Sequence, residues 1–211
     1  MDNIDKIILD LCGGTGAWSK PYRDAGYDVR LVTLPDNDVR TYIPPAGVYG
    51  ILAAPPRTEF SIAKGASPRD LAGAMEIVEA CLRIIWSCRL SGSLRFWALE
   101  NPRGFLRQFL GIPKFTFEQW QYGGDKRKAT DLWGYFASPS PTVVEMPPLF
   151  AAYYTQRNPC GSSNGRAWGK LQYPPEFAEY IRRQPGYAAQ RAAARAITPP
   201  GFAQAFFRAN R

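Results

Sequence analysis

The hydrophobic pattern of the first 110 residues predicts strands and helices in alternation. Short apolar or alternating runs are typical of buried strands, and they lie at residues 7–9, 28–34, 47–53 and 96–99. A helical spacing of apolar positions follows between 68 and 90, where one face carries Leu71, Met75, Val78, Leu82 and Ile85. Shorter helices are expected at 18–25 and 104–110. This alternation predicts an α/β fold with a mostly parallel sheet.

The second half of the chain has a different pattern. Residues 115–121 alternate aromatic and polar side chains, and with residues 132–136 they predict an antiparallel hairpin. Helices are expected at 175–182, 186–196 and 200–209, the last of them packing on the sheet. Because too little chain remains for a second core, residues 155–170 are interpreted as a basic loop. One domain is therefore expected over 1–211.

Composition excludes several classes of protein and of chemistry. No apolar run approaches the ~20 residues that a membrane-spanning helix needs, and Asp2 and Asp5 near the start do not fit a signal peptide. The four cysteines have irregular spacing, and histidine is absent from the whole chain. This excludes Ser-His and Cys-His catalysis, and no metal site is expected. We expect a cytoplasmic protein without a membrane partner.

The charge favours a polyanionic partner. The net charge is +8 at neutral pH, and a strong basic excess is the electrostatic signature of many nucleic-acid-binding proteins. Charge alone does not choose between DNA and RNA.

Residues 7–19 carry the first motif with chemistry, a strand followed by a glycine-rich turn and a helix. Glycines 13, 14 and 16 let the backbone turn sharply and approach a ligand closely. Their spacing is not the dinucleotide fingerprint, and the Gly-Lys-Ser/Thr ending of a phosphate-binding loop is missing. The remaining type of glycine-rich turn is the one that binds S-adenosylmethionine (SAM), and the methionine part of SAM lies against such a turn. A purely structural turn is the alternative.

Two further polar motifs come at strand ends, which is where α/β sheets place their ligands. The strand at 47–53 runs into Ala54-Pro55-Pro56-Arg57-Thr58-Glu59-Phe60-Ser61, and the strand at 96–99 runs into Glu100-Asn101-Pro102. With Asp10-Leu11-Cys12-Gly13-Gly14-Thr15-Gly16 and the stretch from Lys126 to Gly134, the ordered set resembles the DNA cytosine-5 methyltransferases. The similarity is greatest to their compact phage or prophage members, and it covers roughly residues 6–136.

The resemblance implies a Rossmann-like class I SAM-dependent methyltransferase fold, SAM as cofactor, S-adenosylhomocysteine as product and cytosine-containing DNA as partner. In this family a cysteine thiolate adds to cytosine C6, and C5 then accepts the methyl group. By resemblance, Glu100 holds the flipped base and Asn101 orients the neighbouring loop. Basic residues after the middle hairpin contact the base or the DNA backbone, and Lys126, Arg127 and Lys128 stand there. A bacterial or phage-infected cell is the implied setting.

The cofactor set expected from the same resemblance spans three segments. It comprises Asp10, Cys12, Gly13, Gly14, Thr15, Gly16, Trp18, Asp36, Asp38, Val39 and Pro55. Asp36 is the nearest candidate to hold the ribose hydroxyls and Asp38 the next, while Asp38 and Val39 are the alternative contacts of the adenine. For Trp18, Phe60 and Trp133, core packing and stacking on a ligand both remain open.

One departure from the family is severe. The position of the nucleophile, directly after Pro55-Pro56, holds Arg57, and a permanently charged guanidinium cannot add to C6. Three readings follow: a methyltransferase by descent that lost its nucleophile, a module that binds SAM and nucleic acid, or altered chemistry on the same scaffold. In addition, residues 137–195 have room only for a reduced target-recognition region.

Overall fold

The computed structural model describes residues 3–124, 128–146 and 173–211. Its strands are β1 (Ile7–Leu11), β2 (Asp28–Val32), β3 (Val48–Ala53), β4 (Phe96–Pro102), β5 (Phe115–Glu118) and β6 (Ala129–Tyr135). Its α-helices are α1 (Lys20–Asp24), α2 (Leu71–Leu90), α3 (Leu106–Leu110), α5 (Ala178–Arg182), α6 (Gly186–Ala196) and α7 (Pro200–Ala209). Short 3-10 helices are η1 (Ile62–Lys64), η2 (Gln119–Tyr122) and η3 (Pro175–Phe177).

The six strands form one mixed sheet in the order β2-β1-β3-β4-β6-β5. The pairs β1–β2, β1–β3 and β3–β4 are parallel, whereas β6 is antiparallel to both of its neighbours, β4 and β5. Only β6 is therefore reversed. The predicted α/β class with a mostly parallel sheet is confirmed, and the antiparallel pair of strands lies where it was expected.

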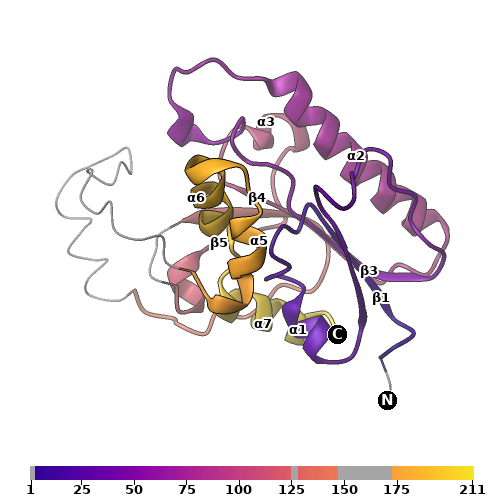
Figure 1. The fold of residues 1–211 in the computed structure, drawn as a ribbon. Helices are drawn as coiled ribbons and strands as arrows, with labels where there is room; N and C mark the ends of the chain where they lie inside the picture. Colours follow the sequence, from indigo (N-terminus) through magenta and orange to yellow (C-terminus); the bar gives the residue numbers. More distant parts are fainter. Residues whose placement is uncertain (1–2, 125–127, 147–172) are drawn as a thin grey trace.

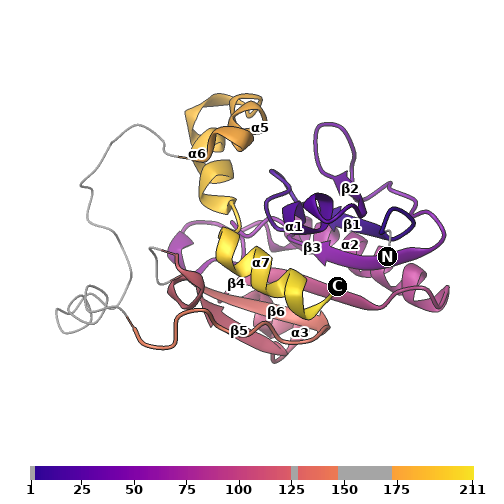
Figure 2. The ribbon, with the colours of Figure 1, turned by 90° about the horizontal axis from the view of Figure 1, so that it is seen from below.

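Helices cover both faces of the sheet, so the strands are apolar on both sides. Leu9, Leu11 and Ile51 face α2 and pack in one buried cluster with its side chains. Their neighbours Ile8 and Leu52 point the other way, into an aromatic cluster that includes side chains of α1 and α7. Figures 1 and 2 show α2 on one side of the sheet and the α1–α7 pair on the other.

The order of the strands reverses direction at β1. From β1 the chain goes to β2 on one side and then to β3 on the other side. Such a reversal separates the loops that leave the two strands and opens a crevice at their carboxyl ends, where α/β proteins bind ligands. The glycine turn follows β1 and the double proline follows β3, so both motifs lie at this crevice.

Some element boundaries differ from the predicted ones. The strand expected at 96–99 extends to Pro102, because Asn101 and Pro102 pair with Asp131 and Thr130 of β6. The strand expected at 115–121 stops at Glu118, where a capping box of Glu118 and Gln121 starts η2. The first helix covers only Lys20–Asp24, rather than 18–25. The helix expected at 68–90 starts at Leu71, because the Asp70 side chain accepts a hydrogen bond from the Gly73 amide and caps it.

The helices α5 and α6 project from the sheet, while α7 lies along it (Figure 2). Their attachment is a small cluster of Ala17, Phe177 and Ile181, and no residue of α6 is buried. Among the described residues, no helix has both the length and the hydropathy needed to cross a bilayer.

Candidate functional site

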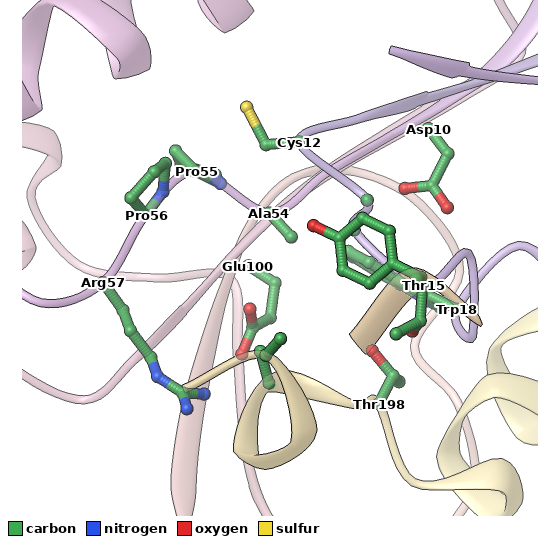
Figure 3. Close-up of a pocket in the computed structure, with 15 residues that line it drawn as sticks. Asp10, Cys12, Thr15, Trp18, Ala54, Pro55, Pro56, Arg57, Glu100 and Thr198 are labelled. Carbon is green, nitrogen blue, oxygen red and sulfur yellow. The ribbon is translucent and has the colours of Figure 1, made fainter. Parts of the chain in front are cut away.

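A cavity of about 170 Å³ lies at the carboxyl ends of β1, β3 and β4 (Figure 3). It brings together the glycine turn, the double-proline loop and Glu100, which are far apart in the sequence. Its lining consists of Asp10, Cys12, Gly13, Gly14, Thr15, Trp18, Ala54, Pro55, Pro56, Arg57, Glu100, Tyr180, Ala193, Ala196 and Thr198. The three strand-end motifs that the sequence singled out therefore share one site.

The glycine turn is built so closely that side chains do not fit. A Cβ atom on Gly13 would lie 2.3 Å from the carboxyl group of Asp10, and Gly14 has a φ of +56°, which disfavours other residues. Cys12 also adopts a left-handed φ of 56°, an uncommon conformation for a residue with a side chain. At Gly13 and Gly14 the turn therefore presents backbone rather than side chains of its own to the cavity.

Asp10 supplies a buried carboxyl group beneath this turn. One oxygen accepts a 2.5 Å hydrogen bond from the Ser19 hydroxyl, while the other, Oδ1, has no hydrogen-bond partner among the described residues. Burial raises the pKa of Asp10 to about 6, and the hydrogen bond from Ser19 opposes that rise. The buried Trp18 Nε1 also lacks a hydrogen-bond partner in the part of the chain that the structure describes. Both groups line the cavity and retain unused hydrogen-bonding capacity.

Asn101 holds the double-proline loop in place. Its side-chain amide is buried and donates a 3.1 Å hydrogen bond to the carbonyl oxygen of Pro55. No described residue hydrogen-bonds the Asn101 Oδ1 atom. Asn101 does not itself line the cavity, and its role of orienting the loop stays a prediction.

Arg57 and Glu100 extend toward the same end of the cavity (Figure 3). Burial raises the pKa of the Glu100 carboxyl, and the positive charges of Lys128 and Arg57 oppose that rise. Burial lowers the pKa of Arg57, and the charge of Glu100 counters it. A guanidinium keeps its charge in proteins, so this end of the cavity places a cation beside an enclosed carboxyl group.

Cys12 is the one thiol in the cavity lining, and its direction matters for the missing nucleophile. In Figure 3 its sulfur points away from Arg57 and Glu100. A hydrogen bond with Cys12, together with burial, raises the pKa of Cys81 on α2. The Cys12 thiol is therefore directed toward the α2 side of the sheet, and it does not replace the nucleophile.

Several predicted site residues lie away from the cavity. Asp36 forms a 3.0 Å ion pair with Arg183, and Asp38 pairs with Arg40. Val39 packs in the core on the α2 side of the sheet. Gly16 is in the turn but does not line the cavity. The predicted roles of Asp36 and Asp38 toward the ribose, and of Asp38 and Val39 toward the adenine, stay predictions.

The remaining predictions concern basic and aromatic residues. Lys126 and Arg127 lie outside the described residues, as do 155–170 and, within the proposed recognition region, all of 147–172. Lys128 is described, and it is near enough to Glu100 to influence its pKa. Phe60 and Trp133 pack in the core, while Trp18 is both buried and part of the cavity lining.

The sequence did not single out every residue of the lining. Tyr180, Ala193, Ala196 and Thr198 come from the C-terminal part and reach the cavity through the tertiary fold. Thr198 comes directly before Pro199, the N-cap residue of α7. The spacing of residues along a helix does not indicate that Tyr180, Ala193 and Ala196 would reach the cavity.

Comparison with known proteins gives no family assignment: no family model and no curated protein matches the chain. Among the described residues, no three acidic, cysteine or histidine side chains are grouped to hold a metal ion.

Proposed function

We propose that this chain is a protein of the DNA cytosine-5 methyltransferase type that binds SAM and a flipped cytosine in the cavity. With Arg57 in the nucleophile position, it forms no 5-methylcytosine by the thiolate route. The observation that supports the proposal is the convergence of the glycine turn, the Pro55-Pro56-Arg57 loop and Glu100 on one cavity at the β1 reversal point.

The residues present fit the cofactor at the glycine turn. Gly13 and Gly14 leave backbone accessible, and Asp10 and Trp18 contribute buried polar atoms that still need partners. Polar groups buried without partners cost free energy, and a bound polar ligand can remove that cost. SAM would supply an electrophilic methyl group on a sulfonium. In this reading Asp10 and the turn orient the methionine part.

Glu100 fits the recognition of cytosine. Cytosine offers an acceptor at N3 and a donor at its amino group. A protonated carboxyl group can donate to N3 while its other oxygen accepts from the amino group. Because burial raises the pKa of Glu100, the protonated form is favoured more than in water.

Arg57 favours binding over transfer to C5. Its guanidinium lines the cavity beside Glu100 and can donate hydrogen bonds to a base or a phosphate. It has no lone pair available to form a bond to C6. The site thus retains groups for holding a base, and the group for activating it is absent.

The decisive experiment compares the protein with its Arg57→Cys variant. Each is incubated with methyl-labelled SAM and cytosine-containing DNA, and the nucleosides are then analysed. We expect 5-methylcytosine only from the cysteine variant, because a thiol at this position restores the addition to C6. Arg57→Ala is the matched control, since it removes the guanidinium without supplying a thiol and should yield no product.

Two outcomes contradict the proposal. Production of 5-methylcytosine by the unchanged protein would mean that another group activates the base. Calorimetry that detects no binding of SAM or S-adenosylhomocysteine at millimolar concentration would remove the cofactor site. If SAM binds but neither protein nor variant methylates DNA, the chain is a binding module whose loop no longer supports transfer.

A further inference from the structure

Tyr180 lies over the glycine turn, although 165 residues separate it from Gly14 in the chain. Its Cε1, Cζ and hydroxyl atoms would be 3.4–3.6 Å from a Cβ placed on Gly14, which is van der Waals contact. The side chain also lines the cavity. Among the described residues, none hydrogen-bonds the Tyr180 hydroxyl.

The helix α5 that carries Tyr180 is attached at two places near the cofactor site. Ile181 and Phe177 pack on Ala17, directly after the glycine turn. One turn along from Tyr180, Arg183 forms an ion pair with Asp36, just beyond the end of β2. The helix therefore spans from the glycine turn to the β2 end, and α6 adds Ala193 and Ala196 to the same cavity wall.

These attachments are weak compared with a packed core. The side chains of the Arg183–Asp36 pair are 46% and 63% exposed, and such surface pairs contribute little. No residue of α6 is buried. Segments with few buried contacts open more easily than the core does, so α5 and α6 can move without unfolding the sheet.

We propose that α5 and α6 form a cap on the cofactor site and that Tyr180 contacts the sulfonium end of SAM. This inference rests on the proposed function, because it assumes that the methionine part lies against the glycine turn. An aromatic ring attracts a cation that carries carbon substituents, as with quaternary ammonium ligands. Tyr180 is then a cofactor-binding residue that favours SAM over S-adenosylhomocysteine, whose sulfur is an uncharged thioether.

The test measures the affinities of SAM and S-adenosylhomocysteine by calorimetry for the unchanged protein and three variants. Tyr180→Leu removes the aromatic ring but keeps an apolar helix-forming side chain, and we expect SAM binding to weaken by about tenfold. S-adenosylhomocysteine binding should weaken less. Tyr180→Phe keeps the ring and should retain the preference for SAM. Tyr187→Leu is the control. Tyr187 belongs to α6 and its side chain is exposed, so this change should alter neither affinity.

The outcomes separate the cap from the function on which it rests. If the unchanged protein binds neither ligand, the proposed function and the cap both fall. If the unchanged protein binds SAM and the Tyr180→Leu and Tyr187→Leu variants have the same affinity for SAM, the cap is overturned while the proposed function stands. Tighter binding by Tyr180→Leu would show that Tyr180 blocks the site, and an equal loss for both ligands would overturn the sulfonium contact. Circular dichroism checks that each variant keeps its helices.

Discussion

Asp10 shows how a single residue in this site lowers stability at neutral pH. Its folded-state pKa of about 6 is above its ordinary value of 3.8, so the native state binds the proton more tightly than the unfolded chain does. This contribution to stability is fully present below pH 3.8 and is lost as the pH rises through 6. At pH 7 the buried carboxylate costs on the order of 3 kcal/mol.

The Asp10→Asn variant should therefore be more stable than the unchanged protein at neutral pH. We expect a gain of about 1–3 kcal/mol at pH 7 that shrinks toward pH 4, because asparagine removes the cost of burying a charge. Urea unfolding at a series of pH values measures it. Asp24→Asn is the control, because the Asp24 side chain is 58% exposed. Its free energy of unfolding should differ little from that of the unchanged protein. If the free energies of unfolding of Asp10→Asn and the unchanged protein depend on pH in the same way, the raised pKa of Asp10 is contradicted.

At the scale of elements, the reversed strand β6 joins the site-bearing β4 to the edge of the sheet. Asp131 of β6 is completely buried and accepts hydrogen bonds from the Arg107 guanidinium of α3, with N···O distances of 2.6 and 2.7 Å. Asp131 also pairs in register with Asn101. This ion pair therefore fixes α3 against the same strand register that positions the Glu-Asn dipeptide.

Removing Arg107 should destabilise the fold more than removing a surface cation. We expect Arg107→Ala to lower the free energy of unfolding by about 2 kcal/mol, since Asp131 keeps the hydrogen bond from the Thr116 hydroxyl but is left buried without its cation, while Arg107 itself is partly exposed. Lys20→Ala is the matched control, because the Lys20–Asp24 pair is 44% and 58% exposed and should contribute less than about 0.5 kcal/mol. Equal midpoints in chemical unfolding for the two variants would refute the role of the pair.

The charge of the whole molecule carries a prediction about its partner. Binding to DNA through Lys and Arg releases counterions, so the logarithm of the affinity should fall linearly with the logarithm of salt concentration. Replacing Lys126, Arg127 and Lys128 with alanine should reduce that slope by about 3. The control replaces Lys20, Arg30 and Arg40, each of which already pairs with an aspartate. Affinity that does not depend on salt would contradict DNA binding through these cations.

Local patterns were sufficient to predict most elements of the fold. The helices at 186–196 and 200–209 have the expected bounds, and the strand-end motifs meet at one cavity as parallel-sheet geometry requires. The extension of β4 could not be predicted, because it depends on pairing with β6 across the chain. Tyr180 was missed for the same reason: its contact with Gly14 follows from how α5 docks, and no periodicity encodes that.

The aromatic contact between Trp18 and α7 has a consequence for the time at which the site can form during synthesis. The Trp18 ring packs on Phe206 with centroids 5.3 Å apart, and the Tyr22 hydroxyl donates to the Asn210 carbonyl oxygen. At ordinary translation rates, roughly 10 to 40 seconds separate the synthesis of Trp18 from that of Phe202 and Phe206. Phe202 and Phe206 both contact Trp18, so until they leave the ribosome the nascent glycine turn lacks its supporting face and the cavity cannot take its final geometry.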